Sequence, residues 1–200
     1  MSCPQAGRKL FETRPDQKLA LWLPLPTTTL SPMASDARFL VSVLMGARDD
    51  WEVMEHTSKM LTELSIAHEV RVLSSHRAPH ATTEYVQNLA GRGIEVVIAA
   101  AGGAAHLAGV VAAHTHLPVL GVPLPSASLQ GLDSLLSTVQ MPAGVPVATF
   151  AIGKPGAINA ALFAAAQLAR RYAGIEASLL EFRRAQTEKT LSVGDPRGSK

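Results

Sequence analysis

From Phe39 onward the chain alternates short apolar runs with longer amphipathic segments, and this alternation limits the fold more than any other feature. Each run is interpreted as mainly apolar rather than alternating, which is typical of strands buried on both faces of a parallel sheet. The pattern predicts strands at Phe39–Met45, Glu69–Leu73, Glu95–Ala100, Pro118–Val122 and Val147–Ala151. We therefore expect an α/β fold in which right-handed crossovers bring the carboxyl ends of the strands to one edge, where such sheets bind ligands.

Helices are expected between and after these strands. The connecting ones are predicted at about Asp50–Leu64, Pro79–Ala90, Ala104–His114 and Gly131–Val139. An alanine-rich helix at Pro155–Ala173 follows, and we expect Gly174 to separate it from a last helix at about Ile175–Leu191. Because alanines cover more than one face of Pro155–Ala173, this helix should be buried among neighbours.

The chain is interpreted as one domain with additions at both ends. The first 36 residues contain five prolines and show no sustained periodicity, so we read 1–36 as a flexible extension, with Met33 as a candidate natural start. The α/β domain spans 37–173, the C-terminal helix spans 174–192, and 193–200 form a tail.

The composition excludes several classes of protein. The 18 basic and 16 acidic residues are too evenly balanced for an electrostatic nucleic-acid binder. No apolar stretch reaches the roughly 20 residues that a bilayer requires. The single Cys3 excludes a disulfide framework and fits a reducing compartment, so we expect a cytoplasmic protein. With only 17% charged residues, the chain is also expected to bury large interfaces in a homo-oligomer.

The turn after the first strand contains Gly46 and the adjacent acids Asp49 and Asp50. The glycine lets the backbone approach a ligand, and the start of the following helix favours an anion. Two aspartates oppose an anion, however, and suit ribose hydroxyls better. A purely structural turn with a helix cap is the alternative.

After the second strand come Ser74, Ser75, His76 and Arg77. An imidazole, two hydroxyls and a guanidinium at a ligand-binding edge form a compact set for proton transfer and phosphate binding. An ordinary surface loop is the alternative.

After the third strand, Ala101, Gly102 and Gly103 predict an open nest of backbone donors for a carboxylate or phosphate. His106 is expected one turn into the next helix, pointing back to the same edge. The loop after the fourth strand is long and rich in small polar residues, as binding segments often are. We predict no metal site, and an imidazole without a metal or cofactor indicates simple proton transfer.

Several motifs occur in one order along the chain, and together they resemble the PurE family, the 5-(carboxyamino)imidazole ribonucleotide mutases of purine biosynthesis. They are Ser74–Pro79, Ala101–Leu107, Leu120–Pro123, Gly131–Leu135, Val139–Pro142, and Ala151–Gly153 through Asn159–Ala161. The resemblance runs from about Phe39 to Thr190. It implies a three-layer α/β/α flavodoxin-like fold, a homo-octamer with the final helix on a neighbouring subunit, and neither metal nor organic cofactor.

The resemblance also implies an isomerase that moves a carboxylate from the exocyclic nitrogen of an aminoimidazole ribonucleotide to ring carbon four, through decarboxylation and recarboxylation. His76 would be the general acid and base, and Arg77 and Ser74 would hold the phosphate. Asp50 would bind the ribose, while the Ala101–Gly103 nest, with His106 nearby, would confine the carboxylate or carbon dioxide. Arg77 directly after His76 resembles the mutases more than the carboxylases that use free carbon dioxide.

One loop departs from the family pattern. Ala47 and Asp49 stand where the family usually has serines, so a carboxylate lies where phosphate contacts are expected. Two alternatives therefore stay open: a diverged relative that carboxylates or decarboxylates another heterocycle, and a non-catalytic octameric binding protein.

Overall fold

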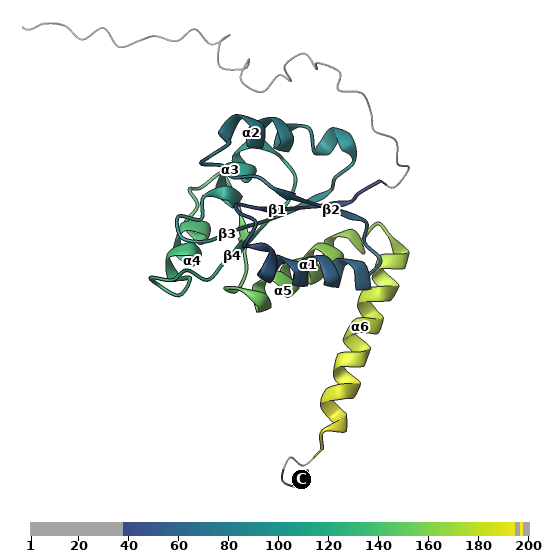
Figure 1. Cartoon of the computed structure of the whole chain (residues 1–200). Coiled ribbons are helices and arrows are strands. Elements are labelled where there is room, and N and C mark those ends of the chain that lie inside the picture. Colours follow the sequence, from purple (N-terminus) through teal and green to yellow (C-terminus); the bar gives the residue numbers. More distant parts are fainter. Residues whose placement is uncertain (1–37, 195–196, 198–200) are drawn as a thin grey trace, which may run out of the picture. The chain divides into compact units, whose positions relative to one another are not determined.

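A parallel sheet in the order β2–β1–β3–β4–β5 forms the centre of the computed structural model (Figure 1). Its strands are β1 Val41–Met45, β2 His68–Val72, β3 Val96–Ala101, β4 Val119–Pro123 and β5 Ala148–Thr149. This order is that of flavodoxin-like doubly wound sheets, so the predicted fold class is confirmed. The structure describes residues 38–194 and 197; the predicted extension 1–36 and most of the tail 193–200 lie outside them.

The helices fall within a few residues of their predicted positions. They are α1 Trp51–Glu63, α2 Pro79–Gln87, a short 3₁₀ helix η3 at Ala90–Arg92, α3 Leu107–His114, α4 Leu132–Val139, α5 Lys154–Leu168 and α6 Ala173–Ser192. The prediction that Gly174 separates the last two helices is wrong, because the break lies at 169–172 and Gly174 belongs to the first turn of α6. Gly174 is not among the glycines with positive φ, and a glycine in helical conformation does not end a helix.

Helices cover both faces of the sheet, and each face has its own apolar core (Figure 1). On one face, Val43, Ile98 and Val122 pack with residues of α1 and α5. On the other face, Leu44 and Val97 pack with residues of α2 and α3. The alternation of neighbouring strand residues between two cores is what the period of two in a strand requires, and it produces the three-layer arrangement.

The outer strands differ from the prediction that every strand is buried on both faces. In β2, Arg71 and Val72 are exposed, and β5 is only two residues long. Both strands have a neighbour on one side only. An edge position leaves part of a strand uncovered. In β2 the charged Glu69 and Arg71 alternate with valines, a sign of partial exposure that the interpretation as an apolar run overlooked.

The burial predicted for the alanine-rich helix is confirmed. In α5, residues including Ala157, Ala160, Ala161 and Ala164 are completely buried. Thr57 of α1 donates a hydrogen bond to the Ala157 carbonyl at 2.9 Å. Small side chains let the two helices approach closely, so this burial arises within the chain itself.

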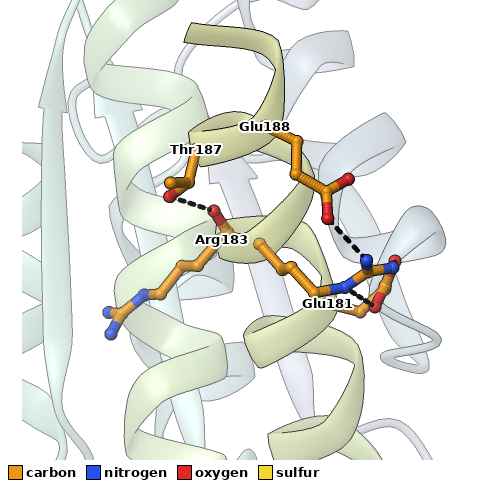
Figure 2. Close-up of polar contacts among 5 residues, drawn as sticks. Glu181, Arg183, Thr187 and Glu188 are labelled. Atoms are coloured by element: carbon orange, nitrogen blue, oxygen red, sulfur yellow. Dashed lines mark hydrogen bonds and ion pairs between the residues drawn. The ribbon is translucent and has the colours of Figure 1, made fainter. Parts of the chain in front are cut away.

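Helix α6 packs only through its first turns. Ile175 and Leu179 are buried, whereas every described residue after Phe182 is exposed. Ion pairs from Arg184 to Glu181 and Glu188 stabilise the exposed part (Figure 2). None of the helices within residues 38–194 is long and apolar enough to cross a bilayer.

Candidate active site

A cavity of about 460 Å³ opens at the carboxyl edge of the sheet, where the loops after β1, β2, β3 and β4 meet. Its size is within the usual range for small-molecule sites. The residues that line it are Gly46, Ala47, Asp50, Ser74, Ser75, His76, Arg77, Ala101, Gly102, Gly103, Ala104, Leu107, Pro125 and Ser126. The structure thus brings together most of the residues that the sequence singled out.

Asp50 supplies a half-buried carboxylate to this cavity. It occupies the N-cap position of α1, but its Oδ2 accepts the backbone N–H of Ala47 at 2.8 Å instead of capping the helix. Burial raises the pKa of the Asp50 carboxyl above its ordinary value of 3.8, and the neighbouring Asp49 adds to the rise. Asp49 and Arg48 are exposed and do not line the cavity.

Arg77 ties two of the loops together. Its Nη2 donates to the Gly46 carbonyl at 3.0 Å, and its backbone N–H donates to Ser74 Oγ at 3.2 Å. The guanidinium Nε also reaches Ser74 Oγ at 3.4 Å. Arg77 remains exposed, so its other N–H donors face solvent or a ligand.

His76 and His106 form a hydrogen-bonded pair. His76 Nε2 lies 3.0 Å from His106 Nδ1, and the rings meet edge to face at 83°. His106 occupies the N-cap position of α3, so its predicted place one turn into the helix is wrong. Because one of the two facing nitrogens must donate and the other accept, the pair holds a proton at this contact.

The glycine-rich loop is held from an element that the sequence analysis did not connect to it. The backbone N–H of Gly103 donates to Ser134 Oγ of α4 at 2.9 Å, so it is not a free donor of the predicted nest. Pro125 and Ser126 after β4 also line the cavity and were not singled out individually. Their only signal was the length and small polar composition of that loop.

The described residues offer no cluster suited to a metal ion, since nowhere do three His, Cys, Asp or Glu side chains come together for one. The groups that line or adjoin the cavity are an imidazole pair, a carboxylate, a guanidinium, hydroxyls and backbone amides. These groups are suited to anion binding and proton transfer.

Comparison with known proteins agrees with this site. N5-carboxyaminoimidazole ribonucleotide mutases of Pseudomonas aeruginosa and Bacillus subtilis are 56% and 51% identical to the chain over 158 and 152 residues. These matches cover 79% and 76% of the chain and 97% and 93% of the relatives. The mutase of Escherichia coli K12 is 47% identical over 159 residues, which are 80% of the chain and 94% of the relative.

A solved structure and a family model extend the comparison. The crystal structure of Treponema denticola PurE superposes with a TM-score of 0.73 at 24% identity, covering 82% of this chain and 100% of the other, which supports the fold. The family model described as AIR carboxylase matches residues 40–189. The chain therefore belongs to the AIR carboxylase family, as the order of its loop motifs predicted.

Proposed function

We propose that this protein is a 5-(carboxyamino)imidazole ribonucleotide mutase of purine biosynthesis, an isomerase that moves a carboxylate from N5 to C4 of the aminoimidazole ring. The observation that carries the proposal is the convergence of His76, Asp50 and Arg77 on one cavity of about 460 Å³. Relatives that bear the name of this activity match the chain over nearly their whole length, which supports it.

In this proposal, a positively charged group and a negatively charged group orient the substrate. Arg77 and Ser74 hold the 5′-phosphate, because a guanidinium with a neighbouring hydroxyl suits phosphate oxygens. Asp50 accepts hydrogen bonds from the ribose hydroxyls. The backbone of Ala101 and Gly102, in the glycine-rich loop that lines the cavity with Gly103, receives the carboxylate.

The reaction needs one proton donor that becomes one proton acceptor. As the N5–carboxyl bond breaks, the bonding electrons stay on nitrogen, which takes a proton from His76, and carbon dioxide is released into the cavity. The C4 carbon of the ring then attacks carbon dioxide and forms the new carbon–carbon bond. Neutral His76 removes the C4 proton, which restores the aromatic ring and returns His76 to its starting state. His106 contacts the same imidazole and fixes which of its nitrogens carries the proton.

The test compares the protein with its His76→Asn variant. Purified protein should convert the carbamate nucleotide to the C4 carboxylate, and His76→Asn should lower kcat by at least about a thousandfold while circular dichroism and Tm stay unchanged. Absence of turnover in the unsubstituted protein, together with no thermal shift from any aminoimidazole ribonucleotide, would contradict the proposal.

The altered loop after β1 does not favour another substrate. Asp49 is exposed and outside the cavity lining, so its charge is screened by solvent from a bound phosphate. The imidazole pair is intact, which favours an enzyme over a binding protein. We therefore place the nucleotide mutase ahead of the diverged relative and the non-catalytic protein.

The assembly belongs to the same proposal. Four apolar side chains on helix α4 and in the loop just before it are exposed and form an apolar stripe. They are Leu129, Leu132, Leu136 and Val139, and each is between 47% and 57% exposed. A stripe of this kind on a charge-poor chain fits a subunit interface. We propose a cytoplasmic homo-octamer in which the C-terminal helix 174–192 of one subunit packs on a neighbouring subunit, outside its own α/β domain 37–173. The proposed protein binds no nucleic acid or membrane and uses no metal or organic cofactor.

A further inference from the structure

We propose that Ser134 is a positioning residue that fixes the glycine-rich loop and thereby keeps carbon dioxide in the cavity between the two half-reactions. The inference rests on the proposed function for the identity of the trapped molecule. Its structural part rests on the contact between Ser134 Oγ and the Gly103 N–H at 2.9 Å.

Gly103 needs an external constraint. Its φ is +65°, a left-handed conformation that glycine adopts easily but does not hold by itself, because an unrestrained glycine visits many conformations. Nothing lies within 4 Å of the position that a Cβ would take on Gly103, so packing does not restrain the loop there. The hydrogen bond to Ser134 selects one conformation.

Ser134 is suited to this task because burial and a backbone hydrogen bond restrain it. Its side chain is completely buried in the first turn of α4, and it does not line the cavity. Its backbone N–H donates to Asp133 Oδ1 at 2.9 Å. One turn later, Ser137 Oγ donates to the Asp133 carbonyl and also lies 3.3 Å from the Gly103 carbonyl, which accepts the Ala105 N–H at 2.9 Å. The same helix therefore contacts both polar groups of the glycine.

The same turn of α4 also holds the neighbouring loop after β4, which packs beside Gly102 and lines the cavity. Ser126, which lines the cavity, donates to Asp133 Oδ1 at 2.6 Å and accepts the Gly131 N–H at 3.1 Å. Asp133 binds Ser126 and the adjacent Ser134 binds Gly103, so two neighbouring residues of α4 position both loops. This link holds two neighbouring loops of the cavity in one relative position.

Retention of carbon dioxide depends on such walls. The molecule is uncharged, so neither Arg77 nor the imidazole pair binds it strongly. It stays only where the walls of the cavity, together with the bound nucleotide, limit its path to solvent. If Ser134 loses its hydroxyl, the Gly103 N–H is left without its partner and the loop samples other conformations. The released carbon dioxide then escapes before C4 attacks it, and the free aminoimidazole ribonucleotide accumulates.

The experiment compares Ser134→Ala with a matched Ser42→Ala control. Ser42 is also completely buried and has a side-chain hydrogen bond, at 2.8 Å, but its partner is the Tyr85 hydroxyl and not the glycine-rich loop. With the carbamate nucleotide as substrate, the ratio of free aminoimidazole ribonucleotide to C4 carboxylate is measured after subtraction of the loss without enzyme. We expect Ser134→Ala to raise this ratio at least fivefold and Ser42→Ala to leave it unchanged.

A second readout tests the loop independently of turnover. Hydrogen exchange of the peptide that contains Gly103 should become at least tenfold faster in Ser134→Ala and stay unchanged in Ser42→Ala. Ser137→Ala removes the longer contact, from Ser137 Oγ to the Gly103 carbonyl, and should raise both the product ratio and the exchange rate by a smaller amount. It replaces Ser134→Ala as the test variant if Ser134→Ala does not fold. Unchanged exchange, or faster exchange with an unchanged product ratio, would overturn the inference. A wild-type protein that forms no C4 carboxylate would instead overturn the proposed function.

Discussion

Asp50, the residue proposed to bind the ribose, shows how a side chain in a binding cavity can cost stability. Its carboxyl is half-buried in the cavity, and burial raises its pKa above 3.8. A raised folded-state pKa means that the protonated form favours folding. The associated stability is fully present below pH 3.8 and is lost as the pH rises through the folded pKa.

Asp50→Asn should therefore raise the Tm at pH 7 and leave it unchanged at pH 3. The amide oxygen can still accept the Ala47 N–H, but the ionisation that opposes folding is gone. Loss of the charge should raise KM at least tenfold, because ribose hydroxyls bind a carboxylate more strongly than an amide. Thermal melts at both pH values and initial rates check this. Asp49→Asn removes only a neighbouring charge that raises the Asp50 pKa, so it should change the Tm at pH 7 less than Asp50→Asn does. A Tm that falls at pH 7 would contradict the account.

Asp49→Ser separates the two interpretations of the altered loop. A carboxylate about 4 Å from phosphate at an effective dielectric near 20 would weaken binding by roughly 4 kcal/mol. Asp49 is exposed and outside the cavity lining, so we expect KM to fall by less than about tenfold. A gain of about a thousandfold, measured by titration of the nucleotide, would mean that the native cavity disfavours phosphate.

At the scale of elements, the sequence pattern was sufficient for the layered fold and for the loops that form the cavity. Apolar runs of strand length indicate the inner strands because these are covered on both faces, whereas the edge strands β2 and β5 are covered only in part. Local patterns do not report contacts between distant residues, so the bond from Ser134 to Gly103 and the pairing of His76 with His106 could not be predicted. The helix boundary at Gly174 was wrong because a glycine's effect depends on the φ that its surroundings impose.

Gly156 in the first turn of α5 tests how closely that helix approaches the preceding loop. A Cβ at this position would lie 1.7 Å from the Ala151 carbonyl oxygen. Because backbone atoms must shift, Gly156→Ala should destabilise the protein by about 3 kcal/mol or more. Gly174→Ala is the matched control, since nothing lies within 4 Å of its Cβ position, and it should be neutral or stabilising by up to about 1 kcal/mol. Urea unfolding measures both, and equal effects would contradict the packing described.

At the scale of the whole molecule, the apolar stripe on α4 tests the proposed assembly. Leu136→Glu places a charge in the middle of the stripe and should dissociate the octamer, because an unpaired charge is costly at a buried interface. Val72→Glu, at a position of similar exposure on edge strand β2, should leave the assembly intact. Light scattering coupled to gel filtration gives the mass of each species. A wild-type monomer would contradict the proposal, and so would an octamer that Leu136→Glu leaves unchanged.

For the whole molecule, we propose that one cavity releases and recaptures the same carboxyl carbon. The most direct measurement uses a carbamate nucleotide labelled with ¹³C in its carboxyl group, in buffer with unlabelled dissolved carbon dioxide, followed by ¹³C NMR. The account predicts that the label appears in the C4 carboxylate with most of its enrichment retained. Loss of the label to the dissolved pool, or a carbamate signal that decays no faster than without protein, would contradict it.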